Sequence, residues 1–236
     1  MSQKTLPGPS DRVLLSWSSG KDCAWALHVL RRGGANVVGL LTTFNEAFAR
    51  VSMHATRREV VEAQARSAGL PLWPVDLPWP CPNEEYESRM AGAMARAKAN
   101  SVTCVAFGDL YLPNVRRYRE EKLAGAGLAA AFPLWTRPDA TAALADEMLR
   151  AGLRAKVSSV DPRRIAGSFA GREYDASLLA DLPPAADRCG ENGEFHTICY
   201  GGPMFAAPIP LESGEVVQRD GFWFADFRLA PKEEKR

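Results

Sequence analysis

The clearest chemical signal in this sequence is a short loop of small residues, Ser18 to Lys21, between an apolar run and a helical pattern. The run 12–17 is predicted to be a buried strand, and 21–32 a helix. A helix N-terminus offers unpaired backbone N–H groups and the positive end of the helix dipole, and small side chains let an anion approach them. Lys21 adds a full positive charge, so the loop is predicted to bind phosphate.

Two familiar nucleotide-binding motifs do not fit this loop. A Walker A loop would need glycine at position 15 and Ser or Thr after the lysine, whereas these positions hold Leu15 and Asp22. The dinucleotide fingerprint needs several glycines, and the loop contains only Gly20. The alternatives left are another kind of phosphate loop or a helix cap without a ligand.

A second set of chemically competent residues follows a predicted strand at 102–107. Gly108 permits a tight turn there, which would present Asp109 at the end of the strand. Arg116 and Glu120 are four residues apart, so they share one face of a predicted helix and could brace a site or hold a triphosphate. An ordinary surface ion pair, and a turn cap at Asp109, are the structural alternatives.

A third segment combines two glycines with two carboxylates, in the order Gly190, Glu191, Asn192, Gly193 and Glu194. Such a loop can bring backbone groups and carboxylates close to a small polar or cationic substrate. His196 follows beside a neighbouring acid and could act as a general base. A Gly–Asn turn before a strand is the structural alternative.

Composition excludes several other classes of protein. The chain has 29 basic and 28 acidic side chains, a balance that gives no general attraction to nucleic acid or to a membrane. It has no apolar run of membrane-spanning length, and residues 1–11 lack a signal-peptide core, so we expect a disordered lead-in. The five scattered cysteines favour a reducing, cytoplasmic location over a disulfide framework.

The order of predicted elements indicates the fold. Strands are predicted at 12–17, 36–43, 72–77 and 102–107, and helices at 21–32, 56–68, 84–99 and 116–126. This alternation predicts an α/β fold with a doubly wound parallel sheet. Ligands of such sheets bind beyond the carboxyl ends of the strands, so Ser18, Thr42 and Asp109 are expected to meet at one edge.

The second half of the chain predicts a smaller mixed α/β region. Its predicted helices are 141–151 and 176–182, and its predicted strands are 155–160, 196–199, 216–219 and 222–227. Gly201-Gly202 and Asp220-Gly221 mark turns between them.

Taken together, the three segments resemble the diphthine–ammonia ligase family of ATP-pyrophosphatases. The run Ser18-Ser19-Gly20-Lys21-Asp22-Cys23 is similar to the Ser-Gly-Gly-x-Asp-Ser loop of that superfamily, from which Ser19 and Cys23 depart. The Gly190–Glu194 block is more specific to the family. Further family blocks occur in the same order, namely Gly108-Asp109, Pro133-Leu134-Trp135, Gly171-Arg172 and Gly202-Pro203-Met204-Phe205. The resemblance covers about Arg12 to Phe227.

This resemblance implies an architecture and a reaction. It implies a HUP-like, Rossmann-like ATP-binding domain over 12–132, a smaller substrate-binding domain over 133–229, and a charged tail over 230–236. In the implied reaction, a substrate carboxylate attacks the α-phosphorus of ATP and magnesium pyrophosphate leaves. Ammonia then displaces AMP to form an amide.

The resemblance also implies a role for each candidate residue. Residues assigned to ATP are Ser16, Ser18, Ser19, Gly20, Lys21, Cys23, Thr42, Gly108, Asp109 and Arg116. Residues assigned to catalysis are Lys21, Asp22, Glu191 and Glu194, with Asp22 also expected to hold Mg2+. Residues assigned to the carboxylate substrate or ammonia are Glu120, Gly190, Asn192, Gly193 and His196.

Departures from the family pattern concern the substrate. Asn192, Phe195 and His196 replace the Gly, Tyr and Glu of members that make diphthamide, so we expect a divergent bacterial branch. The carboxylate can then be protein-bound or a small molecule, as in an amidation of cobalamin salvage. A non-catalytic ATP sensor is the alternative from another class. The near-neutral charge disfavours a tRNA-modifying enzyme, and homo-oligomers are left open.

Overall fold

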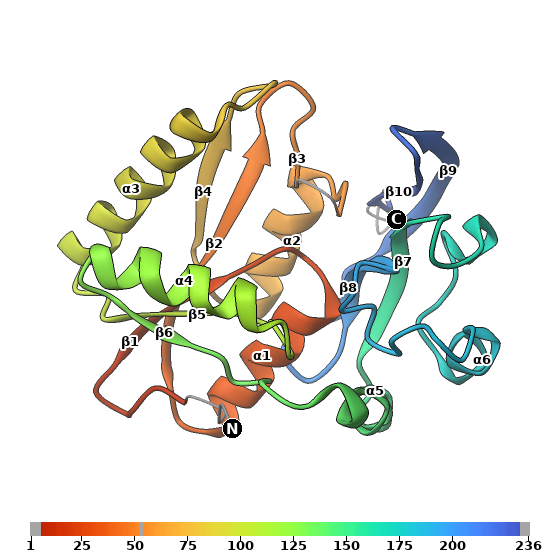
Figure 1. The fold of residues 1–236 in the computed structure, drawn as a ribbon, viewed down its shortest axis with the longest axis horizontal. Helices are drawn as coiled ribbons and strands as arrows, with labels where there is room; N and C mark the ends of the chain where they lie inside the picture. The colour runs from red at the N-terminus through yellow and green to blue at the C-terminus, as the bar shows by residue number, and fades with distance from the viewer. Residues whose placement is uncertain (1–5, 52–53, 232–236) are drawn as a thin grey trace, which may run out of the picture.

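The computed structural model describes residues 6–51 and 54–231, which form two β-sheets with helices packed around them (Figure 1). Residues 1–5 of the expected lead-in and 232–236 of the expected tail lie outside the described residues, whereas 6–11 and 230–231 are described. The first half contains β1 (Arg12–Ser16), α1 (Lys21–Arg32), β2 (Asn36–Asn45), β3 (Arg50–Val51), α2 (Arg58–Ala68), β4 (Leu72–Leu77), α3 (Asn83–Ala99), β5 (Cys104–Ala106), α4 (Pro113–Gly125) and β6 (Ala129–Ala131). The second half contains α5 (Thr141–Arg150), β7 (Arg154–Val160), α6 (Ala176–Asp181), β8 (Phe195–Gly201), β9 (Leu211–Arg219) and β10 (Phe222–Leu229), with short 3-10 helices at Pro138–Ala140 and Gly167–Phe169. None of the helices in these ranges is long and apolar enough to cross a membrane.

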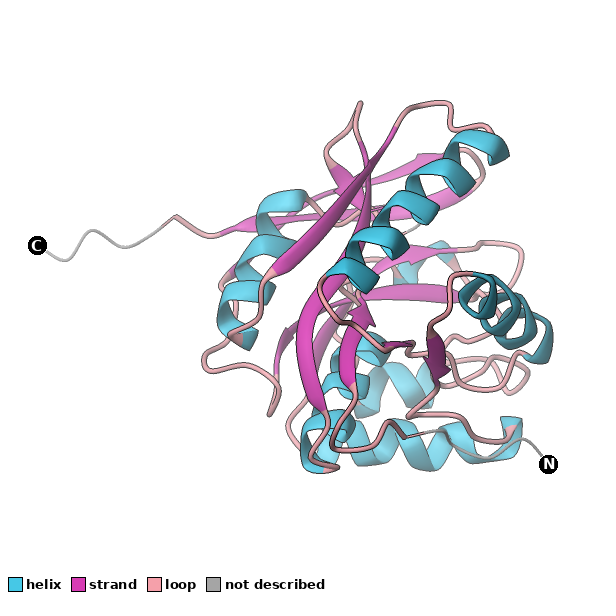
Figure 2. Cartoon of the chain, turned by 90° about the vertical axis from the view of Figure 1, so that its left-hand side faces the viewer, coloured by secondary structure: helices cyan, strands magenta, loops and turns pink. Residues whose placement is uncertain are grey.

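The first sheet confirms the predicted doubly wound topology. Its parallel strands pair in the order β4-β2-β1-β5-β6, and short β3 runs antiparallel to the end of β2. Helices lie on both sides of this sheet (Figure 2). The strand order reverses its direction between β1 and β5, and in open α/β sheets ligands bind at such a switch point.

Strand β1 is buried on both faces, which explains why it is an unbroken apolar run. Val13 and Leu15 belong to the same core cluster as Leu27 of α1. Leu14, which points to the opposite face, belongs to a second cluster with Met94 of α3. The end of β1 is therefore fixed by packing on both sides.

The second sheet is antiparallel, with the strand order β8-β7-β10-β9. In Figure 1 it lies beside the first sheet, where β8 contacts α1 and β10 contacts α2. One core cluster includes Leu27 of α1, Ile198 of β8 and Phe227 of β10. The two sheets therefore share a continuous core across the predicted boundary at 132/133.

Two element boundaries differ from the prediction in ways that affect the site. Strand β2 continues to Asn45, because Phe44 and Asn45 pair with β3 on one side and with the end of β4 on the other. Thr42, already inside the predicted strand 36–43, therefore lies further from the carboxyl end of β2 than expected. Helix α4 begins earlier than expected, with Pro113 in its first turn, a position that does not need the missing N–H.

Gly108 is required where β5 approaches the start of α1. A Cβ atom at this position would lie 2.8 Å from both the Asp22 carbonyl carbon and the Cys23 nitrogen. These are backbone atoms of the first turn of α1 and cannot rotate away. The close approach sets the spacing between the two strand ends that flank the switch point.

We expect Gly108→Ala to lower the free energy of unfolding by about 1–3 kcal/mol, as overpacking against backbone does. Gly92→Ala is the matched control, because a Cβ at this exposed position in α3 meets nothing within 4 Å. The control should be stabilising by about 0.5–1 kcal/mol, since alanine favours helix over glycine. Urea unfolding of both variants checks the pair, and equal effects would contradict the assigned role of Gly108.

Candidate functional site

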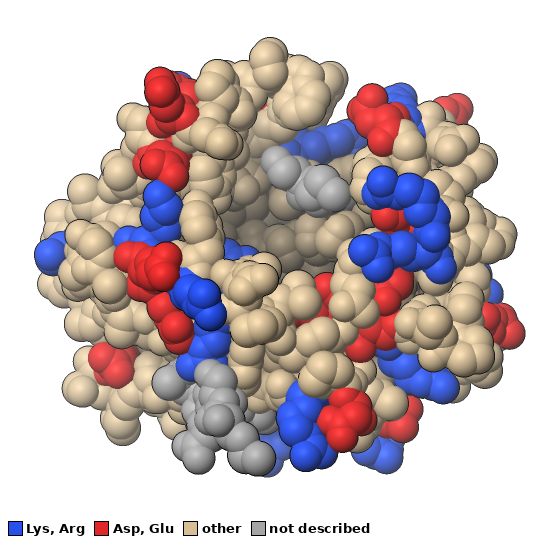
Figure 3. Space-filling view, in the orientation of Figure 1, with Lys and Arg blue, Asp and Glu red and all other residues tan. Residues whose placement is uncertain are grey.

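Two cavities open at the carboxyl ends of β1 and β5, the switch point of the first sheet. Their volumes are about 270 Å³ and 670 Å³. They are adjacent, since Ser16, Ser18, Phe107 and Arg119 line both. Figure 3 shows the face of the molecule hollowed between the half that carries α3 and α4 and the half that carries the second sheet.

The smaller cavity brings the three predicted segments together. Its wall includes Ser16, Ser18, Lys21, Asp22 and Cys23 from the first segment, Gly108 and Asp109 from the second, and Gly190, Glu191, Gly193 and His196 from the third. The topology explains this meeting. The first two segments follow adjacent parallel strands, and the third precedes β8, which packs on α1.

The phosphate loop is held in place by strand β8. The N–H of Cys199 donates to the Ser19 carbonyl at 2.8 Å, and the N–H of Lys21 donates to the Thr197 hydroxyl at 3.0 Å. Ser19 has a left-handed φ of 74°, and its hydroxyl is bonded to that of Thr56 at 2.6 Å. The Ser19 hydroxyl is therefore engaged in the core and is not part of the cavity wall, contrary to its expected contact with phosphate.

Helix α1 begins directly beneath this cavity. Gly20 is its N-cap and supplies no capping side chain, so the first turn keeps N–H groups for a ligand. Cys23 lies in that turn, and its thiol donates to the Gly20 carbonyl at 3.1 Å. Burial raises the pKa of this thiol to about 11. Cys23 was expected to contact the phosphates of ATP. A neutral thiol whose hydrogen bond goes to its own helix is poorly suited to that contact.

Lys21 is buried, with 2% of its surface exposed. Its ammonium group donates to both Asp22 oxygens, at 3.0 and 2.8 Å, and to the Cys189 carbonyl. It also lies 5.4 and 5.5 Å from the ring centres of Tyr174 and Phe195. Burial alone would lower the pKa of Lys21, but the neighbouring Asp22 carboxylate outweighs that effect and raises it. The charge of Lys21 therefore persists inside the site.

Asp22, the residue expected to hold Mg2+, lies at the edge of the smaller cavity. Its side chain is 28% exposed and faces the smaller cavity. Burial raises its pKa and Lys21 opposes that shift. Among the described residues, no group of three or more His, Cys, Asp or Glu side chains is arranged to hold a metal ion. One carboxylate beside a phosphate site suits Mg2+ that arrives on a nucleotide, because Mg2+ is commonly held by one or two carboxylates together with substrate phosphates.

Arg119, not Arg116, is the arginine that reaches the site. Its guanidinium donates to Asp109 at 2.6 and 3.1 Å and lines both cavities. The predicted pairing of Arg116 with Glu120 is confirmed at 2.7 Å. However, Arg116 lies over the rings of Phe132 and Trp135, at 4.7 Å from each, and the pair contributes to neither cavity wall. Of these two arginines of α4, only Arg119 lines the cavities.

Thr42 also lies away from the cavities. It is 1% exposed, and its hydroxyl donates to the Trp17 carbonyl at 2.8 Å. Because side chains alternate along a strand, its neighbours Leu41 and Thr43 face the larger cavity instead. Thr42, expected to lie by adenine, therefore lines neither cavity, whereas Thr43 lines the larger one.

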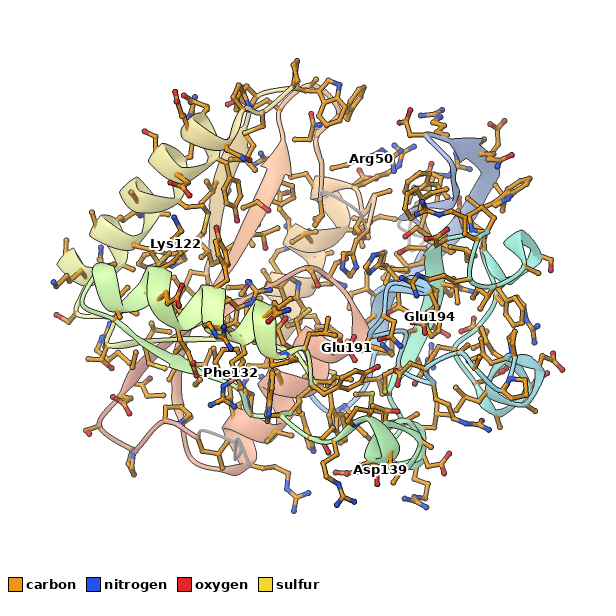
Figure 4. The ribbon with its side chains drawn as sticks, in the orientation of Figure 1. Arg50, Lys122, Phe132, Asp139, Glu191 and Glu194 are labelled. Carbon is orange, nitrogen blue, oxygen red and sulfur yellow. The ribbon has the colours of Figure 1, made fainter. Side chains whose placement is uncertain are left out.

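The two carboxylates of the third segment point in different directions (Figure 4). Glu194 is 3% exposed and accepts hydrogen bonds from the N–H groups of Asp187 and Asn192, at 2.9 and 3.0 Å. The Asn192 amide also donates to it at 3.1 Å. Glu194 and Asn192 therefore shape the loop and do not line the cavity, unlike the direct role expected for them.

Glu191 faces the smaller cavity. It accepts hydrogen bonds from the N–H groups of Leu110 and Tyr111, at 2.8 and 3.5 Å, which link the third segment to the second. Burial raises the pKa of its carboxyl to about 8, and the negative charge of Asp22 adds to the shift. A carboxyl group that titrates near neutral pH can give or take a proton during a reaction.

Two imidazole rings complete the smaller cavity. The ring centres of His54 and His196 are 4.6 Å apart. His54 Nδ1 lies 3.1 Å from the Thr197 carbonyl, and since a carbonyl only accepts, Nδ1 carries the hydrogen. Burial lowers the pKa of His54 to about 3 and that of His196 to about 4. Both rings are therefore neutral at neutral pH.

The apolar wall of the larger cavity was not predicted from the sequence. Tyr86, Met90 and Met94 of α3 line it at four-residue spacing, opposite Val105 and Leu123. That spacing is typical of one helix face and gave no reason to choose a ligand over ordinary core packing. The size and lining suit a flat, mostly apolar group such as a nucleobase.

Comparison with known families gives a match in the first half of the chain. The family model described as "Diphthamide synthase N-terminal domain" matches residues 11–128, half of the sequence. The match contains the phosphate loop and the Gly108–Asp109 block but stops before the 190–194 loop. No curated protein matches the chain.

Glu191 should make stability depend on pH. Its pKa is about 8 in the folded chain against an ordinary value of 4.5, so folding binds a proton between these values. Stability from this group is complete below pH 4.5 and is lost as the pH rises toward 8. As the pH rises between those limits, we expect the free energy of unfolding of Glu191→Gln to increase by about 1–2 kcal/mol relative to that of the wild type. This is less than the full pKa shift implies, because the side chain is partly exposed.

Urea unfolding at the two ends of this pH range measures the effect. Glu120→Gln is the control, because Glu120 is 47% exposed and lies outside both cavities. A Glu191→Gln difference that does not change with pH would contradict the assigned environment.

Proposed function

This chain belongs to the diphthamide synthase family of PP-loop ATP-pyrophosphatases, and on that premise we propose that it is an AMP-forming ligase joining ammonia to a carboxylate. One observation carries the proposal. Three segments far apart in the sequence line a single cavity over the uncapped N-terminus of α1. That arrangement suits a polyphosphate beside a reacting carboxylate.

The two cavities divide the nucleotide between them. The adenosine part fits the larger, apolar cavity, and the phosphates fit the smaller one, over the first turn of α1. Ser16 and Ser18 lie at the junction, where the α-phosphate would be placed. Arg119 also reaches both cavities and can neutralise phosphate charge.

The chain can favour attack on the α-phosphorus through position and charge. Mg2+ bound to the phosphates supplies further positive charge, with Asp22 as the residue to hold it. The N–H groups of α1 and the Arg119 guanidinium would stabilise the charge that grows on the leaving pyrophosphate. Glu191, which titrates near neutral pH, is placed to accept a proton from ammonium so that ammonia can attack the acyl carbon.

The volume of the smaller cavity limits the carboxylate. About 270 Å³ holds the phosphates and one carboxyl end, and leaves little room for a bulky acyl group to be enclosed. We infer that only the end of the substrate enters. A protein-bound carboxylate and a small molecule, including one of cobalamin salvage, both meet this condition.

A nucleotide sensor without turnover is the second candidate. It is favoured by the state of the phosphate loop, in which the Ser19 hydroxyl and the Lys21 ammonium are both engaged by protein groups. Tight binding of ATP with no cleavage between the α- and β-phosphates, across a range of carboxylates, would support it.

We expect the protein, supplied with ATP, Mg2+, ammonium and a panel of carboxylates, to release AMP and pyrophosphate. Chromatographic separation of the nucleotides measures the product, and incorporation of labelled ammonium into an amide identifies the carboxylate. Omission of ammonium is the control, because it should leave adenylation intact and prevent the amide. Sustained formation of ADP instead of AMP would reject the proposed reaction.

We expect Arg119→Ala to weaken ATP binding by about tenfold or more, because a charge-assisted contact to phosphate is lost. Arg117→Ala is the matched control, since Arg117 is an exposed residue of the same helix and lines neither cavity. Isothermal titration with ATP compares the two. Equal ATP affinities of the two variants would mean that Arg119 does not contact the phosphates.

A further inference from the structure

The proposed reaction uses neither imidazole ring of the smaller cavity, although His196 was expected to face the substrate or ammonia. The chain contains three histidines, and two of them, His54 and His196, meet at this one site. They come from different parts of the fold, since His54 lies between β3 and α2 and His196 is the second residue of β8. Their meeting is a product of the tertiary structure.

The rings stand directly against the phosphate loop. A Cβ atom on Gly20 would lie 2.9 Å from His54 Cε1 and 3.3 Å from the Thr197 carbonyl oxygen. His54 Nδ1 donates to that same carbonyl, which leaves Nε2 with a free lone pair. The imidazoles therefore form a wall beside the residue that caps α1, where the loop would hold phosphate.

Burial is the main cause of the lowered pKa of both rings, and the charges around this wall add to it. Lys21 of α1 lies close enough to lower the pKa of both rings, although burial is the larger cause. Arg119 of α4 also faces the cavity, as do the carboxylates Asp22, Asp109 and Glu191. A multiply charged anion placed among these groups would reverse the balance and favour a protonated imidazole.

We propose that His54 and His196 form a second phosphate-binding wall, which contacts the leaving pyrophosphate and takes up one proton as that anion enters. This proposal rests on the proposed function, because it needs a polyphosphate at the loop. The proton comes from the solvent and returns to it when pyrophosphate leaves. One N–H bond forms on a ring nitrogen as the proton arrives and breaks again when it leaves, and no other covalent bond changes.

The geometry limits the uptake to about one proton per site. Two imidazolium ions with ring centres 4.6 Å apart would repel each other strongly. The pair therefore stays neutral in the free protein and carries a single charge in the complex. Such a group binds pyrophosphate more tightly than AMP, which lacks the β- and γ-phosphates.

Histidine NMR of the full chain, with and without magnesium pyrophosphate, tests the proposal directly. The three ring signals are assigned with His28→Gln, His54→Gln and His196→Gln. We expect pyrophosphate to raise the pKa of at least one of the pair by more than about three units, from about 4 to above neutral pH, so that this ring is protonated in the complex. His28, which packs on Trp25 in α1 outside both cavities, should not respond.

Affinity measurements give the second readout. His54→Gln and His196→Gln should each weaken pyrophosphate binding about tenfold, with little effect on AMP binding. His28→Gln should change neither. Equal losses for AMP and pyrophosphate would mean that the rings only support the fold, and would overturn the proposal.

The remaining outcomes separate this proposal from the proposed function. If pyrophosphate binds and neither ring titrates differently, or if His28 shifts as much as the pair, the histidine wall is wrong while the ligase assignment stands. If neither ATP nor pyrophosphate binds the chain at all, the proposed function fails and the histidine wall fails with it.

Discussion

The site depends on the hydrogen bonds between the phosphate loop and strand β8. Two backbone groups of β8 residues, the N–H of Cys199 and the carbonyl of Thr197, bond to Ser19 and to His54. The Thr197 hydroxyl also accepts from the N–H of Lys21. A loop of small residues gains little from side-chain packing, so these bonds fix its shape. They also explain why the chain buries Ser19 in a left-handed conformation.

Further hydrogen bonds around the phosphate loop connect the first half of the chain to the second. Lys21 connects Asp22 of α1 to the Cys189 carbonyl, and Glu191 of the next turn accepts hydrogen bonds from the loop after β5. Glu194 keeps this turn in shape by accepting from Asp187 and Asn192. A few polar contacts therefore join the two sides of the cavity.

Local pattern was enough to predict the fold and the three segments of the site. Apolar runs that alternate with helical periodicity indicated a doubly wound sheet, and the carboxyl ends of its strands indicated where Ser18 and Asp109 would lie. It was harder to predict which way each side chain points. Arg116 and Arg119 are three residues apart, and only the packing of α4 on Phe132 and Trp135 shows which one faces the cavity.

By itself, the sequence determined most of the elements, the loop before α1 and the chemistry available at each position, because these follow from residue type and short-range spacing. The short strands β3 and β6 were not predicted. Only the tertiary structure decided which side chains are free to act. It turned Thr42, Glu194 and the Ser19 hydroxyl into the interior, where buried polar groups must find partners, and it brought His54 to His196. Such pairings depend on contacts between distant segments, which spacing along the chain does not record.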